Sequence, residues 1–229
     1  MSQSQPIALI TGGTGGIGQA IAKNLLEQGY QVLLAARRTH ISLDDELQNR
    51  CHILEMDVTE VEQVTTAFHW VKEHYGRLDL LINAAGGTHF KLLQRMKVAD
   101  WDQSFSLHAK GCFLCSQQAI KLMKPQGHGL IIHIASLAVK QPKPGFAAYG
   151  AAKAALANLS ESLNAEVGRY GIRSIVINPS YVDTPLLGEH SYKPEELIPP
   201  GVIADFIQTI CQLPHHVTLP ELTLSTVSL

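Results

Sequence analysis

The chain has 229 residues, of which 45% are hydrophobic and 17% charged, with a formal net charge of −2 at pH 7. This length and apolar content are enough for one well-covered domain over residues 1–229. The near-neutral charge argues against a partner that is nucleic acid or a membrane surface. The four cysteines, Cys51, Cys112, Cys115 and Cys211, do not resemble a disulfide framework, and the N-terminal segment lacks the basic start of a signal peptide. We therefore expect a cytoplasmic protein.

Short apolar runs alternate with helical patterns along the chain. In chain order, we predict a strand at 7–10, a helix at 16–28, a strand at 31–36, a short helix at 42–48, a strand at 51–56, a helix at 60–75, a strand at 78–82, a helix at 99–123, a strand at 130–135, a helix at 146–167, a strand at 173–177, a helix within 194–213 and a short strand at 221–224. Gly29, Gly76, Pro125 and Gly168 mark the expected helix ends.

The predicted strands are continuous apolar runs and do not alternate between apolar and polar residues. This pattern is typical of strands that are covered on both faces, as in a parallel sheet with helices on each side. Repeated βα units of this kind predict a doubly wound α/β fold, with a parallel sheet of about seven strands. Ligands of such sheets bind at the carboxyl ends of the strands.

A glycine-rich turn, Thr11-Gly-Gly-Thr-Gly-Gly-Ile-Gly18, joins the first strand to the first helix. Glycines allow the backbone to approach a phosphate closely, and the helix N-terminus then offers free N–H groups and a positive dipole end. The turn could be merely flexible, but the strand before it and the helix after it favour a dinucleotide site. The expected cofactor-binding residues of the turn are Gly12, Thr14, Gly15, Gly16, Ile17 and Gly18.

The second predicted strand ends at Ala36 and is followed by Arg37 and Arg38, with no acidic residue. An acidic residue at this place binds the 2′-hydroxyl of NAD, whereas an arginine accommodates the 2′-phosphate of NADP. The sequence therefore favours NADP(H) as cofactor, with NAD(H) possible. A solvated arginine pair on a loop is the alternative.

A tyrosine and a lysine, Tyr149 and Lys153, are four residues apart in a helical segment and so share one helix face. A nearby ammonium lowers the pKa of a tyrosine from its ordinary value of about 10, which suits it for general acid/base work. Tyr-x-x-x-Lys is frequent by chance, but Ser136 follows the fifth strand and Asn83-Ala-Ala-Gly86 follows the fourth. These segments and the glycine turn are expected at the same edge of the sheet.

Together, these motifs and Asn178-Pro179 resemble the classical short-chain dehydrogenase/reductase family over nearly the whole chain. The resemblance implies a single-domain Rossmann fold and interconversion of a small-molecule carbonyl and alcohol with NAD(P)(H). It implies that Tyr149 exchanges the substrate proton, that Ser136 binds the substrate oxygen, and that Lys153 holds the nicotinamide ribose and lowers the pKa of Tyr149. The further implied cofactor contacts are Asp57, Val58, Asn83, Ala84, Gly86, Val182 and Thr184.

The sequence departs from the family pattern at several places. His108 occupies the position of an asparagine that holds a water for proton relay, and it either continues the relay or is a satisfied helix histidine. Ser180 stands where the family usually has glycine. The segment 184–200 is short, which predicts a small substrate lid, an open site, and a modest-sized or poorly specified carbonyl substrate.

Two further motifs are better explained by structure than by chemistry. Cys112-Phe-Leu-Cys115 lies inside a predicted helix, where core packing is favoured over zinc binding or redox work. His215-His216 lacks a third candidate ligand, so we expect no metal site.

An apolar stripe on one predicted helix bears on assembly. It consists of Leu156, Leu159, Leu163 and Val167. By the resemblance, this helix and the preceding long one form the interface of a homodimer or homotetramer, whereas packing within the monomer is the alternative.

Two other functions remain open. A non-catalytic dinucleotide sensor or scaffold is supported only by His108. An extended-type sugar epimerase is disfavoured by the glycine spacing and by the lack of a large C-terminal substrate region.

Overall fold

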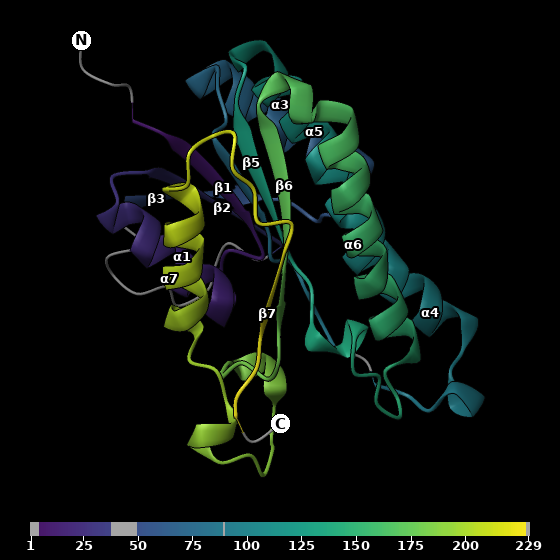
Figure 1. Cartoon of the computed structure of the whole chain (residues 1–229). Helices are drawn as coiled ribbons and strands as arrows, with labels where there is room; N and C mark the ends of the chain where they lie inside the picture. The colour runs from purple at the N-terminus through teal and green to yellow at the C-terminus, as the bar shows by residue number, and fades with distance from the viewer. Residues whose placement is uncertain (1–4, 38–49, 89, 228–229) are drawn as a thin grey trace.

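Seven parallel strands form one sheet in the order β3-β2-β1-β4-β5-β6-β7 (Figure 1). The computed structural model describes residues 5–37, 50–88 and 90–227. The strands are β1 (Ile7–Thr11), β2 (Gln31–Ala36), β3 (Cys51–Glu55), β4 (Leu80–Asn83), β5 (Gly129–Ile134), β6 (Ile172–Pro179) and β7 (Glu221–Leu224). The parallel doubly wound sheet predicted from the continuous apolar runs is confirmed.

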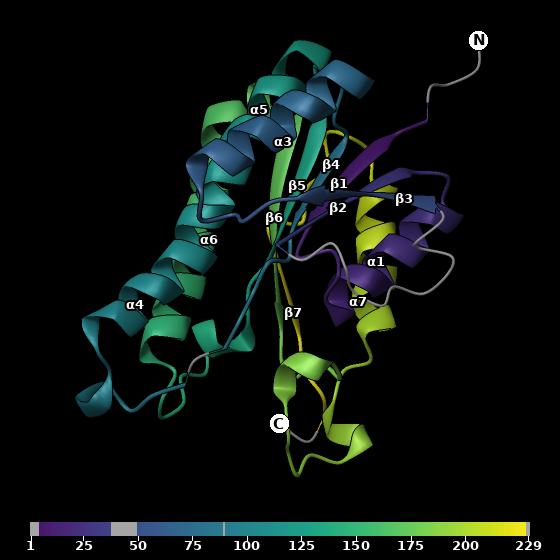
Figure 2. The ribbon, with the colours of Figure 1, turned by 180° about the vertical axis from the view of Figure 1, so that it is seen from behind.

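Helices cover both faces of the sheet (Figures 1 and 2). They are α1 (Gly16–Glu27), α3 (Val61–Tyr75), α4 (Val98–Phe105), α5 (Gly111–Gln126), α6 (Ala147–Val167) and α7 (Pro200–Cys211). Helices α1 and α7 pack side by side on one face, while α3, α5 and α6 cover the other. Each layer has its own buried apolar cluster, in which strand side chains alternate between the two faces.

The strand order reverses beside β1, which lies between β2 and β4. At such a point the chain connections leave in opposite directions, and a crevice opens beyond the carboxyl ends of the strands. The Thr11 hydroxyl bridges this point, because it accepts hydrogen bonds from the backbone N–H groups of Ala84 and Ala85 at 3.2 Å each. The glycine turn is thereby held against the end of β4.

The long helical stretch predicted at 99–123 is confirmed, because the chain is helical without a break from Val98 to Gln126, but two details differ. Helices α4 and α5 are joined by a π-helical segment, Ser106–Lys110, rather than by regular α-helix. Pro125 also does not end the helix, because it lies in the last turn and only Gln126 follows it within α5. The helix ends instead at Gly127, which has a φ of 74° and donates its N–H to the Met123 and Lys124 carbonyls.

Two other predicted helices have different outcomes. The helix expected within 194–213 begins only at Pro200, because two consecutive prolines resist continuation from the upstream 3₁₀ turn Pro194–Glu196. The short helix predicted at 42–48 lies outside the described residues. No helix in the described part of the chain is long and apolar enough to cross a membrane.

The apolar stripe on α6 packs inside the monomer. Leu156, Leu163 and Val167 are 0%, 8% and 6% exposed. Leu156 and Val167 belong to apolar clusters that include residues of the sheet and of α5. Packing within the monomer therefore accounts for the stripe, and the subunit interface that the resemblance implies for this helix and α5 stays a prediction.

Candidate active site

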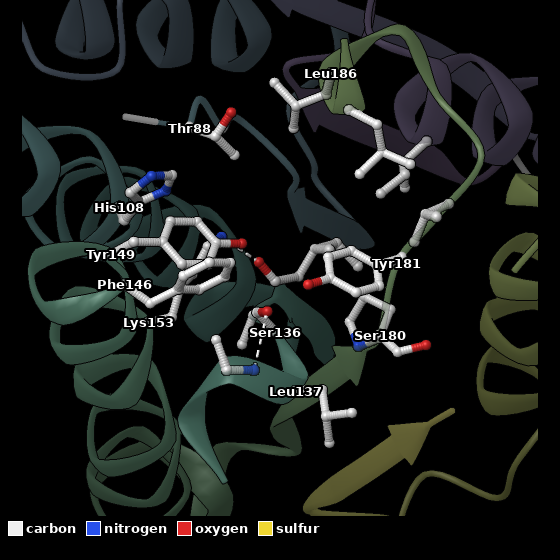
Figure 3. Close-up of a pocket in the computed structure, with 18 of the residues that line it drawn as sticks. Thr88, His108, Ser136, Leu137, Phe146, Tyr149, Lys153, Ser180, Tyr181 and Leu186 are labelled. Carbon is white, nitrogen blue, oxygen red and sulfur yellow. Dashed lines mark hydrogen bonds between the residues drawn. The ribbon is translucent and has the colours of Figure 1, made fainter. Parts of the chain in front are cut away.

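A pocket lies at the carboxyl edge of the sheet, beyond the ends of β4, β5 and β6 (Figure 3). Segments far apart in the sequence supply its walls, including the first turn of α1, the π-helical segment, the start of α6 and the chain after β6. Its lining includes Ile17, Ala84, Gly86, His108, Ser136, Tyr149, Lys153, Val182 and Thr184. The four sequence segments expected to meet at one edge therefore do meet there.

Tyr149 and Lys153 both reach the pocket from the first two turns of α6. Figure 3 shows the Tyr149 ring directed into the pocket, with its hydroxyl towards the opposite wall. The Lys153 Nζ lies 6.0 Å from the centroid of the Tyr149 ring and donates a 2.6 Å hydrogen bond to the Ile134 carbonyl. Lys153 is thus anchored to the end of β5 and is only 5% exposed.

Ser136 lies just beyond β5 and begins the 3₁₀ turn Leu137–Val139. Its Oγ accepts a 3.1 Å hydrogen bond from the Ala138 N–H, which fixes the side chain at the base of the pocket (Figure 3). Because this bond uses only a lone pair of the Ser136 Oγ, the hydroxyl can still donate a hydrogen bond to Tyr149 or to a ligand.

Burial dominates the protonation of both α6 residues. Burial of the Tyr149 hydroxyl raises its pKa, and a hydrogen bond with Ser136 offsets part of that rise. Burial lowers the pKa of Lys153 to about 8, because desolvation disfavours the ammonium. The net shift of the Tyr149 pKa is therefore upward, opposite to the lowering by Lys153 that the resemblance implies.

His108 stands in the π-helical segment between α4 and α5. The wider turn of a π-helix often occurs at functional sites. The His108 ring meets the Tyr149 ring edge-on, with centroids 5.2 Å apart, and its Nε2 donates a 2.9 Å hydrogen bond to the Gly87 carbonyl. His108 is 2% exposed and thus braces both Tyr149 and the loop after β4.

The glycine turn is compact because other backbone segments press against it. Gly12 has a φ of 64°, and a Cβ there would lie 2.7 Å from the Cα of Ala85. A Cβ on Gly16 would lie 2.7 Å from the Cγ2 of Thr184, so the turn also touches the segment that follows β6. Gly15 is exposed and caps α1 without a side-chain hydrogen bond.

The N-terminus of α1 therefore has the features of an anion site. Its first turn carries no acidic residue and no side-chain cap, and Ile17 in that turn lines the pocket. These residues fit a dinucleotide whose phosphates lie at the turn and whose reactive end lies beside Tyr149.

Three predicted cofactor residues around β3 and β4 lie outside the pocket. Asp57 is half-buried and accepts hydrogen bonds from the backbone and hydroxyl of Thr59, and Val58 packs against Gly111. The Asn83 amide points into the protein interior, where it contacts Ser116 at 3.3 Å and His133 at 3.2 Å.

The predicted cofactor residues that follow β2 and β6 lie in different surroundings from one another. Arg37 is exposed directly after β2, beside the glycine turn, whose Gly13 N–H bonds to Ala35. Arg38 lies outside the described residues. Val182 is buried and pairs with Ile198 as an isolated parallel bridge, which ties both ends of the segment 184–200 together.

Most of the remaining wall residues were not predicted from the sequence. They include Phe90, Leu137, Lys143, Phe146, Tyr181, Leu186 and Leu187. Phe90 and Phe146 stack at 4.2 Å, and each meets the Tyr149 ring edge-on at 5.9 Å. Leu186 and Leu187 belong to the predicted lid segment 184–200. The others occupy loops and 3₁₀ turns without periodicity, so no sequence pattern indicated them.

The cysteine pair serves the core, as expected. Cys112 and Cys115 are buried on α5, and none of the four cysteines, all of which lie in the described residues, forms a disulfide. Burial raises the pKa of Cys112 to about 11 and that of Cys115 still further, so neither is a reactive thiolate at neutral pH.

Comparison with known proteins gives a consistent picture. Residues 6–195 match the family model described as short chain dehydrogenase. The chain is 29% identical over 225 residues to an uncharacterised oxidoreductase of Staphylococcus epidermidis, covering 97% of this chain and 98% of the relative.

Solved structures agree. A short-chain dehydrogenase from Streptomyces avermitilis superposes with a TM-score of 0.87 at 29% identity, covering 98% of this chain and 89% of that one. An alcohol dehydrogenase from the archaeon Thermococcus sibiricus, complexed with 5-hydroxy-NADP, superposes with a TM-score of 0.86 at 26% identity, covering 98% and 97%.

Proposed function

The chain belongs to the short-chain dehydrogenase family, and on this premise we propose that it is an NADP(H)-dependent oxidoreductase that interconverts a carbonyl and an alcohol. The observation that carries the proposal is the meeting of Ser136, Tyr149 and Lys153 in one pocket with the uncapped N-terminus of α1. A bound nicotinamide dinucleotide supplies or accepts the hydride.

In the reductive direction, Tyr149 gives the proton to the substrate oxygen. Burial raises the pKa of Tyr149, so the phenol is protonated at neutral pH and can act as a general acid. Ser136 donates a hydrogen bond to the same oxygen without giving up its proton, because its Oγ is already oriented by the Ala138 N–H. Both groups thereby stabilise the negative charge that develops on that oxygen.

Lys153 holds positive charge behind Tyr149 and binds the ribose next to the nicotinamide. Its carbonyl partner, Ile134, uses one of three ammonium protons, which leaves two for the ribose hydroxyls and for a proton path. His108 keeps the Tyr149 ring in place through its edge contact and restrains the loop at Gly87. We assign His108 a positioning role.

The cofactor choice rests on two observations. Arg37 is exposed beside the glycine turn, where a guanidinium can form paired hydrogen bonds with a 2′-phosphate. The Thermococcus sibiricus alcohol dehydrogenase, a 26% identical neighbour, is complexed with an NADP derivative. We therefore propose NADP(H) as the preferred cofactor.

The segment 184–200 is the proposed substrate lid. It carries the 3₁₀ turn Pro185–Leu187, and the Leu186 and Leu187 side chains line the pocket. The Val182–Ile198 bridge closes its base, so the lid is a short tethered loop rather than a separate domain.

We also propose a homodimer or homotetramer. The outer surface of α4 and α5 exposes Val98, Trp101 and Phe113, at 76%, 38% and 46%. Large apolar side chains gathered on a helical surface are typical of an interface between subunits. Light scattering coupled to size exclusion will give the assembly mass, and a monomer at micromolar concentration would refute this assignment.

The test of the activity is a panel of aldehydes, ketones and 3-oxoacyl thioesters with NADPH and NADH in parallel, followed at 340 nm. We expect turnover with NADPH, and a loss of at least about 1,000-fold in kcat for Tyr149→Phe with NADPH affinity retained. Phenylalanine keeps the ring contacts and removes only the hydroxyl. NADPH binding without turnover of any panel member would instead favour the non-catalytic sensor.

A further inference from the structure

The pocket combines apolar walls with one exposed lysine at its rim. Among the described residues that line it, none is aspartate or glutamate. The basic side chains in its lining are His108, Lys143 and Lys153. His108 and Lys153 are buried and bonded to backbone carbonyls, whereas Lys143 stands exposed at the rim.

Lys143 is held in place by an aromatic side chain. Its Nζ donates a 3.1 Å hydrogen bond to the Tyr181 hydroxyl and lies 4.7 Å from the centroid of the Tyr181 ring. The Tyr181 ring in turn packs against Tyr192 of the lid at 4.4 Å. Figure 3 shows Tyr181 facing the Tyr149 hydroxyl across the pocket.

The backbone also fixes the approach of Lys143. The Phe146 N–H bonds to the Lys143 carbonyl at 3.1 Å, in a turn that leads directly into α6. The lysine and Tyr149 are therefore mounted on one continuous segment, only six positions apart in the sequence. Their relative placement is set by a tight turn and a helix start.

Two other exposed lysines near the pocket are paired with carboxylates. Lys140 pairs with Glu221 at 2.8 Å, and Lys91 pairs with Asp100 at 2.8 Å. Among the ion pairs of the described residues, none involves Lys143. The hydrogen bond to Tyr181 uses one of the three ammonium protons of Lys143, which leaves two for an external acceptor.

We propose that Lys143 recognises a carboxylate on the substrate, so that the preferred substrates are carbonyl compounds with an apolar body and a carboxylate at the end remote from the carbonyl. This inference rests on the proposed reductase function of the same pocket. The apolar walls accept the body, Ser136 and Tyr149 bind the carbonyl oxygen, and Lys143 binds the carboxylate at the rim. Because none of the described lining residues is acidic, that charge is unopposed there.

The test compares acids with their methyl esters, which differ mainly in charge. The substrates are 4-carboxybenzaldehyde and 5-oxopentanoate, each paired with its ester and reduced by NADPH. We expect kcat/KM to favour at least one acid over its ester by about 10-fold, as for a hydrogen bond to a charged group. Lys143→Gln should raise KM for that acid by about 10-fold at unchanged kcat, and Lys143→Arg should restore it.

Lys140→Gln is the matched control, because Lys140 lies on the same loop but outside the pocket lining and is paired with Glu221. It should leave the acid-to-ester ratio unchanged. Equal kcat/KM for both acids and their esters, or a ratio that survives Lys143→Gln, would overturn the inference. A weaker affinity of Lys143→Gln for NADPH, with the ratio unchanged, would instead assign the lysine to the cofactor and would equally overturn it.

A binding measurement separates this inference from the proposed function. Calorimetry with 4-(hydroxymethyl)benzoate and its methyl ester, in the presence of NADP⁺, reports carboxylate recognition without turnover. If no panel member is reduced but the acid binds at least 10-fold more tightly than the ester in a Lys143-dependent manner, the function fails and the recognition stands. If reduction proceeds without that preference, the function stands and the recognition fails.

Discussion

The buried ammonium of Lys153 should lower the stability of the folded protein, and Lys153→Met should reveal by how much. Burial lowers the pKa of Lys153 from 10.5 to about 8, and each pKa unit corresponds to about 1.4 kcal/mol of folding free energy. The cost of the buried charge is therefore about 3 kcal/mol. Loss of the hydrogen bond to Ile134 offsets about 1 kcal/mol of the gain, so we expect a net stabilisation of about 2 kcal/mol at pH 7.

The lowered pKa of Lys153 also makes the free energy of unfolding depend on pH. Below pH 8 the ammonium is charged in the folded and unfolded states alike, and the full burial cost is present. Between pH 8 and 10.5 the unfolded chain keeps a proton that the folded chain has released, so the free energy of unfolding rises with pH in this window. Methionine has no such proton, so the advantage of the variant should shrink as the pH rises through the window.

The assay is urea unfolding of wild type and Lys153→Met at matched concentration, from pH 7 to 10. Cysteines and tyrosines that titrate in this range are present in both proteins, so their contributions cancel in the difference, apart from that of Cys112, whose pKa the Lys153 charge lowers. A gain of about 2 kcal/mol corresponds to a Tm higher by about 4–8 °C, because 1 kcal/mol shifts the Tm of a chain of this size by roughly 2–4 °C.

Lys140→Met is the matched control, because Lys140 is exposed and paired with Glu221. It should change stability by less than about 1 kcal/mol at pH 7 and show no corresponding pH trend. The reasoning would be refuted if Lys153→Met were no more stable than wild type at pH 7, or if the difference did not shrink between pH 8 and 10. We expect the same variant to lose activity, so that the stability is gained at the expense of the reaction.

Three further predictions follow from the site. Gly12→Ala should lower the free energy of unfolding by about 2–5 kcal/mol, because it adds a backbone clash to the roughly 1–2 kcal/mol cost of a positive φ. Gly29→Ala, at a φ of 82° with open space around it, should show only the φ cost in thermal unfolding, and equal losses for the two variants would contradict the clash. His108→Asn should keep or raise activity, because Phe90 and Phe146 still hold the Tyr149 ring and an asparagine amide can donate to the Gly87 carbonyl; abolished turnover with intact NADPH binding would show that the reaction depends on the histidine itself. Arg37→Ala should raise the Kd for NADPH by about 10-fold in calorimetry and leave that for NADH within about 2-fold, and equal effects on both would contradict the phosphate assignment.

The sheet and the motif residues could be predicted because local chemistry determines them. Each buried strand needs a continuous apolar run, and the turn after β1 needs glycine at Gly12, where φ is positive and the end of β4 approaches. The spacing of Tyr149 and Lys153 places both on one face of α6 whatever surrounds them. Their proximity to Ser136 then follows from the parallel topology.

The misplaced features depend on contacts between distant segments. The π-helical turn at His108 has no local propensity signal in the sequence. The pKa of Tyr149 depends on how deeply the assembled walls bury its hydroxyl, and those walls include Phe90 and Phe146 from separate loops. Similarly, the apolar stripe that includes Leu156 faces its own sheet, which periodicity alone cannot distinguish from a subunit interface.

The close approach of Gly16 to Thr184 has a thermodynamic consequence. One contact joins the phosphate turn to the first residue of the proposed lid, so a group seated at the turn and a molecule enclosed by the lid share a wall. If binding at one side shifts that wall, the affinity at the other side changes by a factor that is the same in both directions. The apparent affinity for a carbonyl compound is then a property of the pair rather than of the protein alone, and it should differ between the two nicotinamide dinucleotides.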